Sequence, residues 1–314
     1  MLIKMFLISF LTFVQLNCEN FFDFRHDDGK EDIEFTPDGN RRWNENKFWT
    51  KLRNLSREII SCGMDGTDWR LPDIVALCEV ENDTVMEYLT KRSPLRRAGY
   101  EYIMTNSPDV RGIDVAMLYH PGKFKLISTY PLRITPTAGM RPTRDILYAS
   151  GMIITGDTIH ILITHAPSKY GGEKRTRPNR ELVIDRLCDA TDSIRAMHAD
   201  PCIIITGDFN EYASSMTLKK LYDRQLTNVS ENAKGQNGAD ASYKYKGEWK
   251  SIDHIFVGGK LAGLHHETVI NDSPFLLEDD EKYGGKQPFR TYRGWKYRKG
   301  YSDHLPVVAR FKMP

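Results

Sequence analysis

The chain has 314 residues, of which 40% are hydrophobic and 27% charged, and its formal net charge at pH 7 is +2. These proportions are ordinary for a soluble globular protein, and so small a net charge identifies no partner by itself. The sequence has no linker rich in Pro, Ser or Gly, no low-complexity block and no internal repeat. These absences exclude a string of small modules, and we expect one domain over residues 1–314.

The N-terminal apolar run, Met5 to Leu16, has two interpretations. It follows Lys4 and so resembles a signal peptide, but it has no small-x-small cleavage site and is too short to span a bilayer. Cleavage after it would also discard Asn17 or the strand that places it. We therefore expect a retained first strand and favour a cytoplasmic location, with export to the periplasm as the alternative.

The first half of the chain alternates loops, helices and strands. A polar loop covers Asp23 to Asn46, and residues 47–60 carry apolar side chains at helical spacing, which predicts a helix lying on a sheet. A strand after Pro72 ends at Glu79, and a short helix is expected from Asn82 to Leu89. A further strand runs from Arg111 to Tyr119, with Asp114 inside it.

The second half combines a hairpin with another amphipathic helix. Met152 to Ile163 reads as two antiparallel strands around Gly156 and Asp157. A helix is predicted over residues 179–197, directly before the strand that ends at Asp208. This mixture indicates an α/β or α+β fold with substantial antiparallel sheet.

The five cysteines are odd in number, widely spaced and mostly set in apolar segments. No CxxC motif or Cys/His cluster is present, so we expect buried free thiols, with a disulfide framework or a zinc site as the alternatives. The residues are Cys18, Cys62, Cys78, Cys188 and Cys202.

Polar side chains recur where apolar runs end. The run from Cys202 leads through Gly207 to Asp208 and Asn210, which face the same way at period two. Together with similar residues elsewhere they supply hard oxygen ligands and no sulfur, the set preferred by Mg²⁺, Mn²⁺ or Ca²⁺. Each residue alone could be a turn or a cap. The set is Asn17, Glu79, Asp208, Asn210 and Asp303.

Two histidines at strand ends have carboxylates that could orient them. His165 is assigned Asp114 as its partner and His304 is assigned Asp253, which suits general acid or base work near neutral pH. A lone histidine at a strand end is more often structural, but two with acidic partners favour catalysis.

Arg144 has a planar fork that could reach a phosphoryl oxygen, while a surface salt bridge to Asp145 is the alternative. The sequence contains no Walker loop, no Gly-x-Ser-x-Gly elbow and no Gly-x-Gly-x-x-Gly after a strand. These absences disfavour nucleoside-triphosphate, serine-hydrolase and dinucleotide chemistry. Metal-assisted hydrolysis of a phosphoester remains.

The chain resembles the endonuclease/exonuclease/phosphatase superfamily, whose members include pancreatic-type deoxyribonucleases and inositol-phosphate 5-phosphatases. The matching segments occur in order over nearly the whole chain. They are Asn17–Asp23, Cys78–Asn82, Gly112–Ala116, Thr143–Asp145, Thr164–Ser168, Gly207–Asn210, Ile252–His254 and Ser302–Val307.

The resemblance implies a four-layer α-β-β-α sandwich with two mixed, largely antiparallel sheets and an active site at the rim where the sheets meet. It makes Glu79 the principal metal ligand, with Asn17 and Asp303 near the same Mg²⁺ ion, for which Mn²⁺ or Ca²⁺ could substitute. It also implies that Asp208 and Asn210 position the attacking water and the phosphate, and that His304 with Asp253 activates the nucleophile or stabilises the transition state. By the same resemblance, His165 with Asp114 contacts the phosphate or protonates the leaving group. Arg144 is expected to contact the phosphate.

The substrate class has to be inferred from local features of the sequence. The segment Lys282 to Tyr301 has seven Lys or Arg, no acid and six interleaved aromatic residues, which suits a nucleic-acid strand. A second basic segment, Lys169 to Arg180, follows His165. Solvated loops balanced by Glu278 to Glu281 are the alternative. The residues expected to grip nucleic acid are Arg290, Arg293, Trp295, Lys296 and Arg298.

We therefore predict a monomeric Mg²⁺-dependent phosphodiesterase that acts on nucleic acid, most simply as an endonuclease, with no stable membrane span. A phosphatase or phosphodiesterase for an inositol phosphate, a phospholipid or another small phosphate ester is the second hypothesis. A catalytically inactive binding protein of the same fold is the third.

Overall fold

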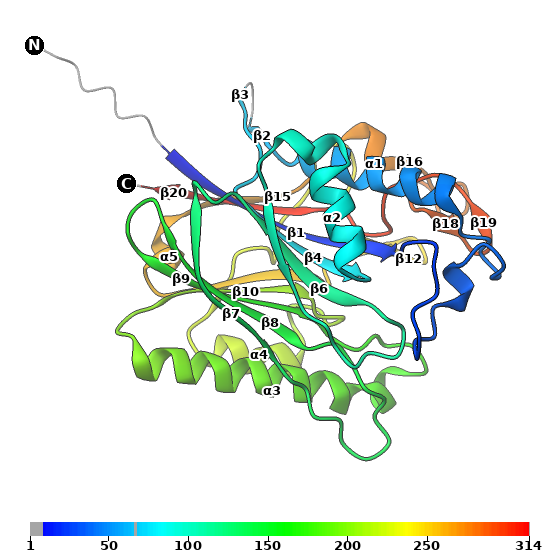
Figure 1. Ribbon diagram of the computed structural model, residues 1–314. Coiled ribbons are helices and arrows are strands. Elements are labelled where there is room, and N and C mark those ends of the chain that lie inside the picture. The colour runs from blue at the N-terminus through cyan, green and yellow to red at the C-terminus, as the bar shows by residue number, and fades with distance from the viewer. Residues whose placement is uncertain (1–8, 66–67, 314) are drawn as a thin grey trace, which may run out of the picture.

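Two six-stranded β-sheets lie face to face in the computed structural model, which describes residues 9–65 and 68–313 (Figure 1). Helices cover the outer face of each sheet, so the chain forms the four-layer α/β sandwich that the resemblance implied. Only two neighbouring strand pairs in these sheets, β1 with β4 and β9 with β10, run parallel. The prediction of mixed, largely antiparallel sheets is confirmed.

The order of strands interleaves the two ends of the chain. The first sheet has the order β15 (His265–Ile270), β20 (Val307–Met313), β1 (Ser9–Phe21), β4 (Ile74–Val80), β6 (Asp114–Tyr119) and β5 (Glu101–Met104). The second has the order β11 (Thr227–Asn228), β14 (Asp253–Gly258), β10 (Cys202–Asp208), β9 (Thr158–His165), β8 (Ile146–Ile153) and β7 (Phe124–Leu132). The predicted hairpin around Gly156 joins β8 to β9.

The helices pack as their apolar stripes require. α1 (Glu45–Ser61) and α2 (Asp83–Lys91) cover the first sheet, while α3 (Glu173–Met197) and α4 (Met216–Tyr222) cover the second; α5 (Lys260–Leu264) is a single short turn. The predicted 47–60 helix is confirmed as α1, whose cap is the Asn44 side chain. α3 starts six residues earlier than expected and contains Pro178, whose missing N–H removes one hydrogen bond of the helix.

Short elements complete the fold. Single 3₁₀ turns occupy Ile33–Phe35, Pro94–Arg97 and Pro274–Leu276. Four small hairpins pair β2 (Met64–Asp65) with β3 (Asp68–Trp69), β12 (Tyr243–Tyr245) with β13 (Glu248–Lys250), β16 (Leu277–Asp279) with β17 (Lys286–Pro288), and β18 (Tyr292–Arg293) with β19 (Lys296–Tyr297).

Apolar side chains fill three layers: one between the sheets and one beneath the helices of each face. Val14 and Leu16 of β1 face the α1 side, whereas Leu11 and Phe13 face the other sheet, as the alternation of a strand requires. All five cysteines are free and buried, which confirms their expected role as packed thiols.

The N-terminal run lies partly outside the described residues. From Ser9 onward it forms β1, which pairs with β20 on one side and β4 on the other. A strand is thus confirmed for its described part. None of the helices in the described ranges is long and apolar enough to cross a membrane.

Candidate active site

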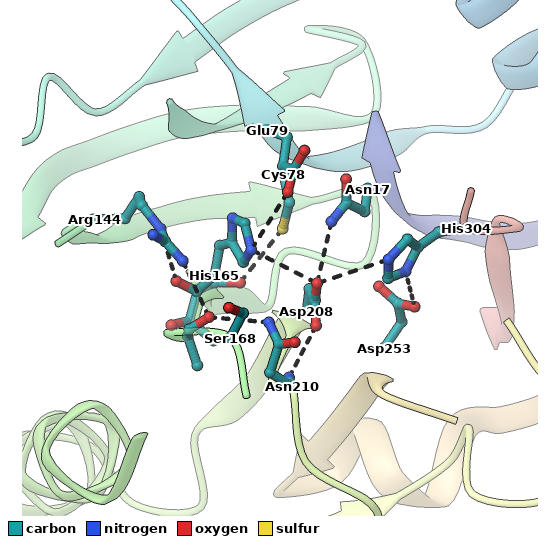
Figure 2. A network of polar contacts seen from close by, with 12 residues as sticks. Asn17, Cys78, Glu79, Arg144, His165, Ser168, Asp208, Asn210, Asp253 and His304 are labelled. Carbon is teal, nitrogen blue, oxygen red and sulfur yellow. Dashed lines mark hydrogen bonds and ion pairs between the residues drawn. The ribbon is translucent and has the colours of Figure 1, made fainter. Parts of the chain in front are cut away.

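The register of the second sheet places three predicted site residues side by side. Asp208 ends β10 and is paired with His165, the last residue of β9, and with Asp253, the first residue of β14. In the first sheet, Asn17 of β1 is paired with Cys78 of β4. Figure 2 shows that Asn17, Glu79, His165 and Asp208, which come from the two sheets, and His304, which comes from the segment before β20, point toward one another.

Bulges in the first sheet redirect the side chains that this sheet contributes to the site. The register shifts after Asn17 in β1 and after Cys78 in β4, and Glu19, Asn20 and Glu79 all have positive φ angles, of 49°, 53° and 62°. Bulges at a sheet rim redirect side chains, and left-handed non-glycine residues persist only where surrounding contacts hold them. One such contact is the Asn20 N–H, which donates to Glu79 Oε2 over 2.7 Å.

Asp208 occupies the centre of the group. Its Oδ2 accepts a hydrogen bond from Asn17 Nδ2 at 3.1 Å and lies 3.6 Å from His165 Nε2 and 4.0 Å from His304 Nε2. Its Oδ1 accepts from the Asn210 backbone N–H at 2.9 Å. Burial, followed by the charge of Asp253, raises the pKa of Asp208 to about 7. The carboxyl is therefore poised near neutrality.

The expected pair of His304 and Asp253 is present. His304 Nδ1 lies 2.7 Å from Asp253 Oδ2, which also accepts from Ser242 Oγ at 2.6 Å. Burial lowers the pKa of His304, but the carboxylates of Asp253, Asp303 and Asp208 outweigh it and raise that pKa to about 10. The ring is consequently an imidazolium at neutral pH and can donate from Nε2.

The expected pair of His165 and Asp114 is wrong. Asp114 is buried and accepts instead from the hydroxyls of Thr105 and Ser107 and from the Ser107 N–H. Within the described ranges, His165 Nδ1 has no hydrogen-bond partner, while its Nε2 lies 3.8 Å from Glu79 Oε1. Burial, then Arg144 and Arg111, hold the pKa of His165 well below its usual range, so the ring is neutral.

Arg144 also departs from its expected role. Its Nε donates to the His165 carbonyl and its Nη2 to the Ala166 carbonyl, both at 3.1 Å, and its Nη1 lies 3.0 Å from Asp109 Oδ2. The buried guanidinium is thus used to shape the loop after β9 rather than held open for a phosphoryl group. The alternative salt bridge to Asp145 is also wrong.

A divalent metal fits the donor set. The predicted ligands Asn17, Glu79 and Asp303 offer oxygen atoms, and the Asp303 side chain keeps 25% of its surface exposed, beside His304. Burial and then the charge of Asp303 raise the pKa of Glu19 to about 7. The charges of Asp253 and Glu79 likewise help to raise the pKa of Asp208. Crowded carboxylates of this kind are stabilised by a cation such as Mg²⁺.

A second grouping of ligands overlaps this centre. One ligand atom from each of Asp208, Asp253 and His304 lies within 4.8 Å of the others. Asp253 already binds His304 and Ser242, so we assign this grouping to the orientation of His304. Glu79, Asn17 and Asp303, which the resemblance named, remain the predicted ligands.

Sequence reasoning missed two residues of the centre. Glu19 is buried and accepts from the Thr291 N–H at 2.6 Å, with Lys51 Nζ 3.8 Å away. Arg111 Nη2 donates to Asn20 Oδ1 at 2.6 Å and lies 3.9 Å from Glu79 Oε1. The only signal was position, because both stand within or directly beside segments that carried the resemblance.

Two recesses lie beside residues that contact Glu79. One, of about 660 Å³, is lined by Arg111, Arg141, Arg144, Ser168, Tyr170 and Arg175, and the other, of about 240 Å³, by Glu19, Asn20, Arg41, Trp43, Arg290 and Asp303. The hydrogen bond from Arg111 to Asn20 links their walls beside Glu79. Each recess is therefore lined by a residue that contacts the predicted metal ligand.

Only some of the residues expected to bind nucleic acid are exposed. Arg298 Nη2 lies 2.8 Å from Glu278 Oε2, and Arg293 Nη1 lies 3.8 Å from Glu281 Oε2. Tyr292 and Tyr301 are buried, while Trp295 and Lys296 are exposed. Arg290 lines the smaller recess. In the second basic segment, Arg180 is buried against Glu211.

Comparison with known proteins supports the architecture. Three similar solved structures are a truncated TDP2 from Caenorhabditis elegans (16% identity, TM-score 0.59, 97% of this chain and 98% of that one), an endonuclease/exonuclease/phosphatase from Bacteroides vulgatus (14%, 0.61, 98% and 100%) and the mannosyl-6-phosphatase Bt3783 from Bacteroides thetaiotaomicron (16%, 0.60, 95% and 98%). At these identities they show the fold alone. No curated protein matches the chain.

The sequence itself matches a family model over nearly its whole length. Residues 12–313 fit the model described as "Endonuclease/Exonuclease/phosphatase family". Members of this superfamily are hydrolases that act on phosphoesters and generally use divalent metals. The chain belongs to the endonuclease/exonuclease/phosphatase family.

Proposed function

We propose that this protein is a Mg²⁺-dependent phosphodiesterase that cleaves nucleic acid, most simply as an endonuclease. The observation that carries the proposal is the presence of two recesses next to Glu79, one lined by its neighbour Arg111 and the other by its neighbour Asn20. A phosphodiester has a substituent on both sides of the phosphorus, whereas a monoester needs room for only one. A site open in two directions therefore favours the diester.

The recess walls suit a nucleic-acid strand. Tyr170 lines the larger recess with 91% of its surface exposed, and Arg111 and Arg175 lie on the same wall. Next to the smaller recess, Trp295 is 66% exposed and the Arg41 guanidinium lies 5.3 Å from its ring centre. Exposed aromatic faces stack on bases and arginines contact phosphates.

The chemistry assigned to His304 is electrostatic. Asp253 holds Nδ1, so the protonated Nε2 faces Asp208 and the space where a phosphoryl group would lie. A fixed cationic donor stabilises charge as it develops on a phosphoryl oxygen. His165, which is neutral, is assigned to phosphate contact through Nε2, and no carboxylate of the described residues holds its Nδ1 as Asp253 holds that of His304.

Asp208 is assigned to the attacking water. Hydrogen bonds from Asn17 Nδ2 and the Asn210 N–H fix both of its oxygens, which gives the carboxylate one orientation. The Asn210 side chain donates to the Ala166 carbonyl at 3.1 Å, so it secures the loop after β9. A carboxyl with a pKa near 7 can accept a proton from water at neutral pH.

Glu79, Asn17 and Asp303 would hold the metal, which when bound supplies Lewis-acid neutralisation of phosphoryl charge. The residues around them keep those ligands in place. Ser302 Oγ donates to the Asn17 carbonyl at 2.6 Å, and the Asn20 N–H fixes one oxygen of Glu79.

A phosphatase or phosphodiesterase for a small phosphate ester is the second candidate. Many side chains of the segment from Lys282 to Tyr301 are buried or form ion pairs. Fewer of them are therefore left to bind a polymer, which favours this candidate.

The test is Mg²⁺-dependent turnover on supercoiled plasmid, single-stranded DNA, RNA, abasic duplex, inositol phosphates, sphingomyelin and a hexose 6-phosphate. Wild type and Asp208→Asn are compared, with and without chelator. We expect nucleic-acid cleavage that the substitution and the chelator abolish. Turnover of a small or lipid phosphate with no cleavage of any polymer would select the second candidate, and silence on every substrate would favour an inactive binding protein.

A further inference from the structure

A second acidic cluster lies outside the catalytic centre, where the loop after β1 meets the end of β4. One carboxylate oxygen from each of Asp27, Asp32 and Glu81 lies within 4.8 Å of the others. Asp32 and Glu81 are buried, and Asp27 is half-buried. Three like charges so close together are unfavourable unless a proton or a cation lies among them.

The hydrogen bonds of the cluster leave it incomplete. Glu81 Oε2 accepts from the Asp23 N–H at 2.6 Å, but Glu81 Oε1 is buried and has no hydrogen-bond partner in the described part of the chain. Asp27 Oδ2 receives only a long contact of 3.4 Å from Asn82 Nδ2. Glu81 thus belongs to a cluster of three carboxylates while one of its buried oxygens lacks a donor, and a cation could supply the missing partner.

The cluster has one potential cationic partner among the described residues. His26 Nδ1 contacts Asp32 Oδ1, while Asp32 Oδ2 accepts from the Asp27 N–H at 2.8 Å. Lys30 Nζ instead donates to the carbonyls of Ser107 and Asp109, at 3.1 and 2.9 Å. No Lys or Arg among residues 9–65 and 68–313 lies within 4.0 Å of the three carboxylates, so His26 can offset the charge of Asp32 but not that of Asp27 or Glu81.

We propose that Asp27, Asp32 and Glu81 bind a structural Ca²⁺ ion, at a site distinct from the catalytic metal centre. The donors are all oxygens, which excludes a preference for zinc or copper. Ca²⁺ accepts irregular geometry and a high coordination number from loop carboxylates and water, whereas Mg²⁺ requires near-octahedral order. The half-exposed side of Asp27 gives the ion access to water.

The position of the cluster gives the ion a role. Glu81 follows Glu79 by two residues, and the loop that carries Asp27 and Asp32 begins directly after the bulge at Glu19 and Asn20. A Ca²⁺ ion at the cluster ties this loop to the end of β4. It thereby stabilises the two bulges that aim Glu79 without touching the substrate.

The experiment is a Ca²⁺ titration of the full chain in saturating Mg²⁺, followed by thermal unfolding and by calorimetric binding. Wild type should bind Ca²⁺ and gain roughly 4 °C in Tm when Ca²⁺ is about 100-fold above its Kd. Asp27→Asn, chosen because its side chain makes only one long contact, should lose the response, and Glu81→Gln should lose it as a second variant.

Matched controls locate the ion. Asp28→Asn makes the same change at the neighbouring exposed position and should keep the full Ca²⁺ response, as should Glu79→Gln and Asp303→Asn at the catalytic centre. Absence of a response in wild type would overturn the proposal and assign the cluster a shared proton. A response kept by Asp27→Asn and Glu81→Gln, or lost in both catalytic-centre variants, would also overturn it.

Discussion

The two sheets supply the same centre in different ways. The second sheet presents Asp208, His165 and Asp253 at regular strand ends in matched register. The first presents Glu19, Asn20 and Glu79 from bulges in the left-handed region of backbone space. A regular strand end places its side chain through the sheet itself, whereas a bulge depends on contacts from outside the strand. The two sides should therefore respond differently to substitution.

The largest expected effect is at Asp208. Asp208→Asn keeps the shape of the side chain but removes the negative charge that faces both histidines. It also replaces the carboxylate that accepts a hydrogen bond from Asn17. We therefore expect kcat to fall by about 10⁴-fold. Steady-state turnover on the best substrate measures it. Glu79→Gln should instead raise the Mg²⁺ concentration needed for half-maximal activity.

The folding of Asp208→Asn is checked by its melting temperature, which should stay at or above that of wild type because a crowded buried charge is removed. If kcat of the well-folded variant stayed within about tenfold of wild type, Asp208 would have no role in activating water.

The second prediction tests how rigid the regular strand end is. Gly207, with φ of 146°, precedes Asp208, and a Cβ there would lie 1.7 Å from the Thr164 carbonyl oxygen. Gly207→Ala should therefore cost about 3–5 kcal/mol of unfolding free energy, measured by urea denaturation. Asn20→Gly, in the β1 bulge, should stay within about 1 kcal/mol because glycine adopts positive φ freely. Equal losses in the two variants would contradict the contrast between the sheets.

The same contrast explains which parts of the site could be predicted from the sequence. The strand endings at His165, Asp208 and Asp253 follow from alternation and apolar runs, and so does the α1 stripe of Phe48, Leu52, Leu55 and Ile59. The pairing of His165 with Asp114 could not be judged, because sequence spacing does not show that Thr105 and Ser107 surround Asp114. Contacts across distant segments decide such cases.

Local irregularity explains the residues that were missed. Glu19 lies in the β1 bulge and accepts from the Thr291 N–H, whereas Arg111 lies in the turn before β6 and donates to Asn20, and neither contact has a local sequence signal. The expectation for the segment from Lys282 to Tyr301 failed for a related reason. Composition identified basic and aromatic residues correctly, but it could not distinguish an aromatic face that packs inward from one that faces solvent.

The third prediction concerns Glu58, a buried acid of α1 on the first-sheet side, neither of whose oxygens has a hydrogen-bond partner in the described part of the chain. Burial raises the pKa of Glu58 from 4.5 to about 8. The unfolded chain releases the proton above pH 4.5 while the folded chain keeps it. Stability from this group is thus full below pH 4.5 and declines as pH rises toward 8.

Glu58→Gln removes this titration, so the variant should be about 3 kcal/mol more stable than wild type at pH 7 and similar to it near pH 4.5. Urea denaturation across this pH range measures the difference. A difference that does not change with pH would show that Glu58 is already ionised in the folded protein.

The smallest expected effect separates the exposed part of the Lys282–Tyr301 segment from its packed part. Trp295 is exposed beside Arg41, whereas Arg298 is held by Glu278. Trp295→Ala should weaken binding of single-stranded DNA by about fivefold, since loss of one stacked base costs roughly 1 kcal/mol or more. Arg298→Ala should leave the affinity within about twofold and lower the melting temperature instead. Fluorescence anisotropy in Ca²⁺ without Mg²⁺, at two salt concentrations, measures both variants. Equal affinity of wild type and Trp295→Ala would remove the stacking surface from the proposal and shift support to a small phosphate ester as substrate.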